Sequence, residues 1–149
     1  MNIIKIRKAE KKDKKLIYKW FNLKESINYK IKTKRKISLR EHNIWFNKII
    51  KKKYNKLLII EENRKNIGQI RLELIKINTF TIDIFILKDF RKKGVATEAL
   101  KISEQLLKKN SKIISIVKKN NINSLGFFMS NDYKVIKNSK ICWYLEKTI

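Results

Sequence analysis

Hydrophobic and polar residues follow two different periods along this 149-residue chain, and the changes of period predict the order of its elements. Runs rich in β-branched and aromatic residues predict strands, and apolar residues at helical spacing predict helices. We expect strands at residues 2–9, 56–63, 65–75, 79–87, 112–119, 133–138 and 140–147. We expect helices at residues 14–22, 39–52, 95–109 and 121–132.

Local signals sharpen several of these boundaries. Ser38 is a good N-cap for the helix that follows it, and Glu41 completes a capping box. Asn63 and Arg64 predict a tight turn between two strands. Residues 79–87 are apolar at nearly every position, which is typical of a central strand that is buried on both faces. Because strands and helices are interleaved, we predict one α/β (α+β) domain over residues 1–149, a sheet covered by helices.

Composition is compatible with an ordinary globular protein. Hydrophobic residues make up 43% of the chain, which is enough for a core. No apolar run approaches the roughly 20 residues of a membrane span, and the N-terminal segment lacks the features of a secretory signal. Cys142 has no cysteine partner and lies in a strand-like segment, so we predict a buried structural thiol. These features predict a cytoplasmic protein without a membrane partner.

The formal net charge of +25 raises the question of a polyanionic partner. The lysines are scattered along the whole chain, without a basic tail, an arginine-rich block or a repeat. The abundance of Lys, Ile and Asn is also what A/T-rich codons produce. We therefore expect no specific nucleic-acid partner, although a basic nucleic-acid-binding module is the alternative of another class. Such a module would lose affinity steeply with added salt.

The segment "DFRKKGVATEAL" at residues 89–100 stands where a predicted strand gives way to a helix. The first N–H groups of a helix have no partners within the helix, and the helix dipole adds partial positive charge there. Small residues at 94 and 96 would let an anion approach those groups. Neither a P-loop nor a Rossmann fingerprint is present. From the residues alone, an ordinary strand–helix turn with solvated lysines is the favoured explanation, because a single glycine in a basic turn is common.

The segment Arg91-Lys-Lys-Gly94-Val-Ala96 resembles the R/Q-x-x-G-x-G/A signature of the GCN5-related N-acetyltransferase superfamily. Asn121 and Ser124 resemble the start of the family's N-x-x-[AS] helix, so the resemblance extends over essentially the whole domain. It implies acetyl-coenzyme A as the co-substrate, no metal, and direct attack by an amine. It also implies a mixed, mostly antiparallel sheet that is splayed where the cofactor binds.

The resemblance implies specific cofactor contacts. A pantetheine arm would pair with the backbone of one strand, and the basic corner would hold the pyrophosphate. The residues concerned are Ile84, Phe85, Ile86, Arg91, Lys92, Lys93, Gly94, Val95, Ala96, Thr97, Asn121 and Ser124. Two positions depart from the family. Phe128 replaces the usual tyrosine acid, and Ile116 replaces the glutamate base of the ribosomal-protein enzymes.

The N-terminal half resembles a subgroup that acetylates nucleotide-linked amino sugars, with its W-R-N, I-S-x-x-x-H-x-x-W-F and I-G-x-I-R segments. That resemblance implies a small-molecule amine acceptor, a nucleotide sugar. It also implies acceptor contacts from Trp20, Asn22, Trp45 and Arg71. The structural alternatives are core packing for the two tryptophans and capping of a strand edge for Arg71. Phe21 stands where the pattern has arginine. Protein N-terminal acetylation of the ribosomal-protein type is the alternative activity, and either a monomer or a homodimer is compatible with the sequence.

Two residues are candidates for the base that removes the amine proton. Asp83 lies in the middle of an apolar strand, where a carboxylate is costly unless it is paired or used. His42 is the only histidine, and imidazole titrates near neutral pH. The structural alternatives are a lysine-paired carboxylate at the sheet surface and a half-exposed helical histidine.

Overall fold

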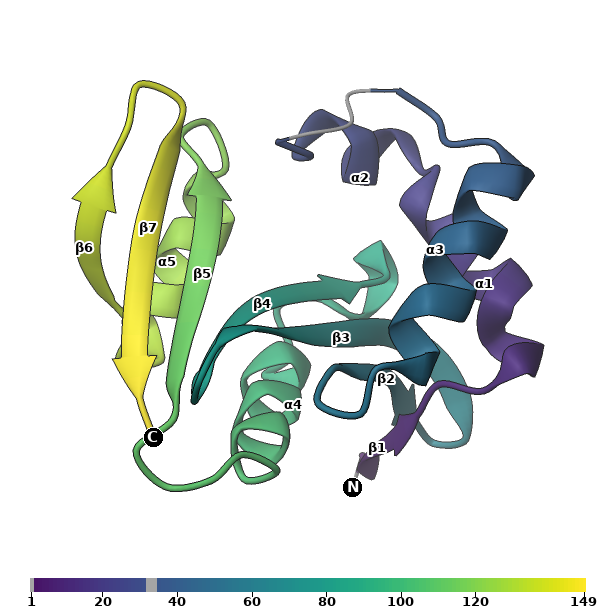
Figure 1. Ribbon diagram of the computed structural model, residues 1–149, viewed down its shortest axis with the longest axis horizontal. Helices are drawn as coiled ribbons and strands as arrows, with labels where there is room; N and C mark the ends of the chain where they lie inside the picture. Colours follow the sequence, from purple (N-terminus) through teal and green to yellow (C-terminus); the bar gives the residue numbers. More distant parts are fainter. Residues whose placement is uncertain (1, 32–34) are drawn as a thin grey trace.

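The computed structural model describes residues 2–31 and 35–149, and these form a seven-stranded sheet in the order β1-β2-β3-β4-β5-β7-β6, with helices on both faces (Figure 1). The strands are β1 Ile4–Lys8, β2 Lys56–Glu62, β3 Lys65–Lys76, β4 Thr79–Ile86, β5 Lys112–Lys118, β6 Lys134–Asn138 and β7 Cys142–Thr148. The α-helices are α1 Lys14–Phe21, α2 Lys24–Asn28, α3 Leu39–Lys51, α4 Val95–Glu104 and α5 Ile122–Ser130. Short 3₁₀ turns are η1 Lys11–Asp13 and η2 Lys88–Phe90. The predicted fold class is confirmed.

The sheet is mixed and mostly antiparallel, as expected. Strands β1 to β4 pair antiparallel in chain order, β4 and β5 pair parallel, and β7 lies antiparallel between β5 and β6. The predicted turn joins β2 to β3, and Asn63 and Arg64 have φ values of 49° and 68°. Positive φ at both central residues is the requirement of a type I′ hairpin turn, whose twist matches that of the strands.

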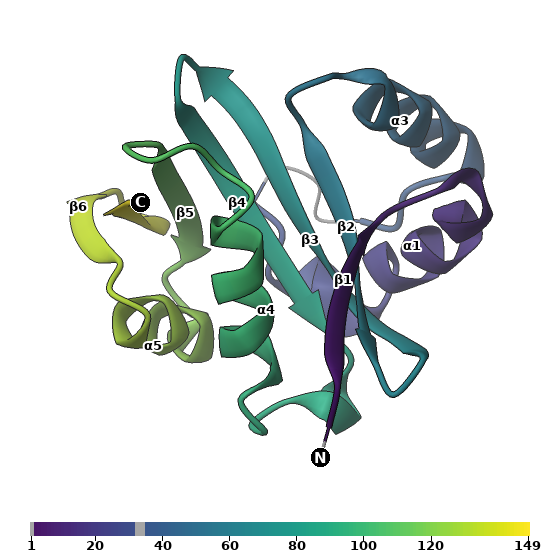
Figure 2. The same cartoon turned by 90° about the horizontal axis from the view of Figure 1, so that it is seen from below.

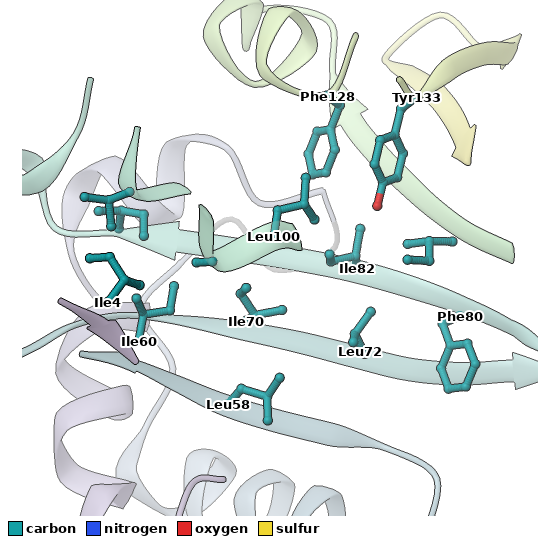
Figure 3. Packing of buried hydrophobic residues seen from close by; sticks show 14 of the residues in the cluster. Ile4, Leu58, Ile60, Ile70, Leu72, Phe80, Ile82, Leu100, Phe128 and Tyr133 are labelled. Carbon is teal, nitrogen blue, oxygen red and sulfur yellow. The ribbon is translucent and has the colours of Figure 1, made fainter. Parts of the chain in front are cut away.

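Strand β2 shows why the chain has two hydrophobic cores. Its run of apolar residues is buried on both faces of the sheet, and successive side chains point in opposite directions. Leu57 and Ile59 pack with the buried residues of α1 and α3. Leu58 and Ile60 join the larger core beneath α4 and α5 (Figure 3). Figure 2 shows α1 and α3 on one face of the sheet and α4 and α5 on the other.

The N-terminal end of α3 has the predicted capping box. The Ser38 hydroxyl accepts a hydrogen bond from the Glu41 N–H at 3.2 Å, and the Glu41 carboxylate accepts one from the Ser38 N–H at 3.4 Å. These bonds satisfy N–H groups that have no partner within the helix. The start of α3 is therefore determined locally.

Strands β4 and β5 separate after a short stretch of pairing. Residues 79–82 of β4 pair with residues 112–115 of β5, whereas residues 83–86 pair only with β3. In Figure 1 the two strands meet near the lower end of the sheet and diverge towards the top. Gly68 of β3 faces this part of β4, and an added Cβ would lie 2.1 Å from the Phe85 carbonyl oxygen. The absence of a side chain at Gly68 is thus what lets β3 approach the free half of β4.

Most predicted bounds differ from the structure by one or two residues, and two helices differ by more. The helix that we expected over residues 95–109 ends at Glu104, because the chain must turn there to enter β5. Leu106 continues the helical spacing but lies outside the helix, 49% exposed. Helix α2 was not predicted, since its five residues are too short to show a period. Cys142 is buried, as expected.

Candidate active site

The basic corner between η2 and α4 is formed mainly by backbone groups. Gly94 is the N-cap of α4 and has a φ of 77°, in the left-handed region that glycine adopts without steric cost. The first backbone bond of the helix runs from the Glu98 N–H to the Gly94 carbonyl, at 3.1 Å. The N–H groups of the first helical residues, 95–97, therefore have no acceptor within the helix. An added Cβ at Gly94 would meet nothing within 4 Å, so the space beside these donors is open.

The side chain of Arg91 is already engaged within the protein. Its Nε donates a hydrogen bond to the Ile86 carbonyl at 2.7 Å, and its Nη2 lies 2.9 Å from the Glu25 carboxylate on α2. Two residues that the resemblance assigned to the cofactor, Arg91 and Ile86, are therefore bonded to each other. The ammonium groups beside the open cradle belong to Lys92 and Lys93, which are both exposed.

The other residues assigned to the cofactor lie on β4, on α4 and at the start of α5. Ile84 and Phe85 lie on the part of β4 that has no β5 partner, and both are half-buried. Val95 is buried in the larger core and Ala96 packs against it. The Thr97 hydroxyl accepts a hydrogen bond from the Asn131 amide at 3.3 Å. The Asn121 carboxamide oxygen caps α5 by accepting from the Ser124 N–H at 3.2 Å.

A second group of side chains lies where α1 and α3 cover β3 and β4, and we call it the acceptor cluster. It consists of Phe21, His42, Trp45, Arg71 and Asp83. The Phe21 and Trp45 ring centroids lie 4.9 Å apart, and both rings contact that of His42. The Arg71 guanidinium carbon lies 5.5 Å from the Trp45 centroid and 6.0 Å from that of Phe21. Arg71 and Asp83 face each other across the β3–β4 pair.

The Asp83 carboxylate has only long contacts with its neighbours. Its Oδ2 lies 4.0 Å from the Arg71 guanidinium and 3.4 Å from the Gln69 amide nitrogen. Its side chain is 51% exposed, although the strand around it is apolar. These contacts leave most of the acceptor capacity of the carboxylate available.

His42 is completely buried, contrary to the alternative of a half-exposed helical residue. Its Nε2 lies 2.8 Å from the Lys14 carbonyl oxygen of α1, so Nε2 carries the proton and donates. Nδ1 is then an acceptor, and it has no partner among the described residues. Burial lowers the pKa of the imidazole from its ordinary value of 6.5, despite the hydrogen bond to Lys14. His42 is therefore neutral at neutral pH and links α3 to α1.

Trp20 and Asn22 have partners within the protein. Trp20 is 2% exposed and belongs to the core between α1, α3 and β2. The Asn22 amide donates to the Ile37 carbonyl at 3.1 Å and its oxygen accepts from the Ile37 N–H at 2.8 Å. Trp45, which is half-buried, and Arg71 are the members of the expected acceptor set that lie in the acceptor cluster.

Two positions depart from the family pattern, 128 and 116, and neither places a proton donor in the site. Phe128 is buried in the larger core, and Ile116 is an apolar residue that is 39% exposed. The nearest tyrosine along the chain, Tyr133, donates its hydroxyl to the Glu104 carboxylate at 3.1 Å. Burial, together with the Glu104 charge, raises the pKa of the Tyr133 phenol well above its ordinary range. Tyr133 is thus a structural residue of the core.

Sequence reasoning did not identify Lys30 or Glu25 as residues near the site. Lys30 follows α2 and donates a hydrogen bond from its ammonium group to the Phe21 carbonyl at 2.8 Å. Glu25 lies on α2, whose five residues are too few to show a hydrophobic period in the sequence. Among so many lysines, no pattern in the sequence distinguishes Lys30.

Residues 2–31 and 35–149 contain neither a candidate metal site nor a candidate membrane-spanning helix. No group of three or more His, Cys, Asp and Glu side chains in those ranges could hold a metal ion. No helix there is long and apolar enough to cross a membrane.

Solved structures with this fold include acetyltransferases. A domain from Methanocaldococcus jannaschii superimposes with a TM-score of 0.86 at 19% identity, covering 100% of both chains. Spermidine N-acetyltransferase from Vibrio cholerae, in complex with CoA and spermine, gives 0.83 at 18% identity, covering 97% of this chain and 95% of that one. Campylobacter jejuni N-acetyltransferase PseH, in complex with acetyl coenzyme A, gives 0.73 at 19% identity, covering 98% and 99%. The fold is therefore that of N-acetyltransferases.

The family follows from the sequence comparison. The family model described as acetyltransferase (GNAT) domain matches residues 4–134. The chain therefore belongs to the GNAT acetyltransferase family and is an N-acetyltransferase of that type. A search of curated proteins found no match.

Proposed function

We propose that this protein transfers the acetyl group of acetyl-CoA to the primary amine of a nucleotide-linked amino sugar. The observation that supports this acceptor best is the acceptor cluster. It places a carboxylate, Asp83, beside a guanidinium, Arg71, that packs against the rings of Phe21 and Trp45. Such a site can take an amine, an anionic group and a flat ring of one molecule.

The corner and the split between β4 and β5 fit acetyl-CoA. The free N–H groups at the start of α4 suit a pyrophosphate, with Lys92 and Lys93 adding charge and Gly94 leaving space. Residues 83–86 of β4 pair only with β3, so their other edge offers backbone groups to an extended arm, apart from the Ile86 carbonyl, which already accepts from Arg91. When bound, acetyl-CoA would supply the acetyl group as a reactive thioester.

In the proposed reaction, Asp83 accepts a proton from the acceptor ammonium, directly or through a water molecule, so that the neutral amine can attack the thioester carbonyl. A new C–N bond forms, the nitrogen gives its second proton to solvent, and the C–S bond breaks so that coenzyme A leaves as its thiolate. Solvent supplies the proton for the leaving sulfur, because Phe128 and Ile116 carry no ionisable group. We assign proton removal to Asp83 rather than to the other candidate, His42, which is completely buried.

The positive charges around the acceptor cluster favour an anionic acceptor over a polyamine. The V. cholerae structure contains spermine, a polycation. Here the acceptor cluster contains Arg71, and Lys30 lies against the same Phe21 ring. The net charge of +25 adds a positive field that attracts anions and repels polyamines. A nucleotide sugar carries a negatively charged diphosphate, so this surface favours it.

Transfer of labelled acetyl groups from acetyl-CoA to a panel of acceptors tests the proposal. The panel would contain UDP-linked and CMP-linked amino sugars, N-terminal peptides of ribosomal proteins, and spermidine. We expect selective labelling of an amino-sugar nucleotide. Labelling of peptides alone would establish the alternative of protein N-terminal acetylation, and labelling of spermidine alone would contradict the electrostatic reasoning.

A further inference from the structure

Two cations from distant parts of the chain meet at one aromatic ring. The Lys30 ammonium nitrogen lies 5.5 Å from the centroid of the Phe21 ring and donates to the Phe21 carbonyl at 2.8 Å. The Arg71 guanidinium carbon lies 6.0 Å from the same centroid. Like charges near one another cost free energy unless anions offset them. The carboxylates near Arg71, Glu73 at 3.6 Å and Asp83 at 4.0 Å, do not approach it closely, so a further anion can bind here favourably.

Arg71 differs from the other ion-paired arginines of the protein. Arg7, Arg35 and Arg91 each approach a carboxylate oxygen within 2.7–3.0 Å. The Arg71 guanidinium lies 3.6 Å from Glu73 and 4.0 Å from Asp83, and it makes no hydrogen bond within residues 2–31 and 35–149. Its side chain is only 27% exposed. A guanidinium has five N–H donors in a planar fork, and partly buried donors without partners favour an anionic ligand.

We propose that Lys30 and Arg71 form an anion subsite for the acceptor, which binds a phosphate group of its diphosphate while Asp83 faces its amine. This inference rests on the proposed function, since it assigns one end of the acceptor to each part of the cluster. It makes Lys30 a specificity-determining residue. An acceptor that carries both an amine and a diphosphate satisfies both ends of the site, whereas a polyamine or an uncharged amino sugar does not.

The surroundings of Lys30 are consistent with this role. Partial burial lowers the pKa of its ammonium group, with the Asp83 charge raising it and the Arg71 charge lowering it further. Lys30 is thus electrostatically coupled to both ends of the cluster. The arrangement also accounts for Phe21. The sequence pattern has a basic residue at position 21, and here Lys30 brings a positive charge against the ring that stands in its place.

The test measures binding of UDP by calorimetry to protein that is already saturated with coenzyme A, so that the cofactor cradle is not available to phosphates. We expect UDP to bind the wild type, and Lys30→Met and Arg71→Gln each to weaken binding by about tenfold or more, as loss of a charge-assisted hydrogen bond predicts. Inorganic pyrophosphate should show the same dependence on both residues. Lys53→Met is the matched control, because Lys53 also lies 5.5 Å from an aromatic centroid, that of Tyr54, outside the cluster.

Steady-state kinetics give a second readout. Both substitutions should raise KM for the nucleotide sugar and leave KM for acetyl-CoA unchanged, and an amino sugar without phosphate should be insensitive to them. The inference is overturned if coenzyme A abolishes UDP binding, or if Lys30→Met binds UDP like the wild type. If UDP binding depends on both residues but no nucleotide sugar is acetylated, the anion subsite stands and the proposed acceptor is wrong. If a nucleotide sugar is acetylated equally well by Lys30→Met, the proposed function stands and the subsite is wrong.

Discussion

The corner before α4 and the acceptor cluster are built in opposite ways. The corner uses backbone groups of consecutive residues, and its geometry depends on one glycine with a φ of 77°. The acceptor cluster uses side chains from α1, α3, β3 and β4, which are brought together only by packing on the sheet. A backbone site tolerates many side chains around it and suits a ligand common to a whole family. A side-chain site changes with each substitution and can select one acceptor.

Replacing Asp83 should have the largest effect on the reaction and should leave the corner intact. Asp83→Asn keeps the shape of the side chain and removes the proposed base. General base catalysis contributes on the order of a hundredfold to ten-thousandfold, so we expect kcat to fall by about a hundredfold or more. Binding of acetyl-CoA should not change. Glu73→Gln is the matched control, because Glu73 also lies near Arg71 but is not assigned to the chemistry. Equal losses in both variants would contradict the assignment of Asp83.

A negative charge placed at the corner should weaken binding of acetyl-CoA and leave the acceptor cluster intact. We compare Gly94→Asp with Gly94→Asn, because the two side chains have similar shapes and differ in charge. Both residue types tolerate the left-handed conformation better than most other residues with a side chain. The aspartate would face the bound pyrophosphate, and a like-charge contact costs several kcal/mol, so acetyl-CoA affinity should fall by about a hundredfold or more. The asparagine variant should lose much less. Calorimetry with acetyl-CoA measures the difference, and equal affinities would place the pyrophosphate elsewhere.

Gly68 pairs with Ile86 at the end of β4, the strand that carries Asp83 of the acceptor cluster and leads to the corner, so a change there should disturb both regions. Gly68→Ala would place a Cβ 2.1 Å from the Phe85 carbonyl oxygen and force β3 away from β4. Overpacking of this kind costs about 1–3 kcal/mol in the free energy of unfolding, and we expect the upper end because the clash is with backbone. Gly126→Ala is the control. Its Cβ would meet nothing within 4 Å, and alanine in a helix gains about 0.5–1 kcal/mol over glycine. Thermal unfolding of both variants would show opposite shifts, and a neutral Gly68→Ala would contradict the close approach.

His42 should contribute the smallest effect, on the pH dependence of stability. Because burial lowers the pKa of His42 in the folded state, the unfolded chain binds more protons below its ordinary value of 6.5. The contribution to stability is therefore complete above about pH 7 and is lost as the pH falls through and below 6.5. His42→Gln should remove this part of the pH dependence of the unfolding free energy between pH 7.5 and 5. An unchanged slope in the variant would mean that folding does not change the pKa of His42.

Most of the architecture could be predicted from the sequence, because it depends on local signals. The capping box of Ser38 and Glu41, the turn at Asn63 and Arg64, and the central strand β4 were all confirmed. Failures occurred where the local signal was weak or misleading. The spacing of Leu106 extends the helical pattern past Glu104, and α2 is too short to have a pattern at all.

The sequence by itself determined the family, the fold and the start of a helix after Gly94, since the change from strand to helical period is a local property of the segment. Only the tertiary structure decided that His42 is buried against Lys14 and that Arg91 is bonded to Ile86 and Glu25. Only the tertiary structure also brought Lys30 and Arg71 to the same ring. The physical reason is that such contacts depend on how the helices pack on the sheet and on the β3–β4 register, which place residues far apart in the sequence within hydrogen-bonding or van der Waals distance.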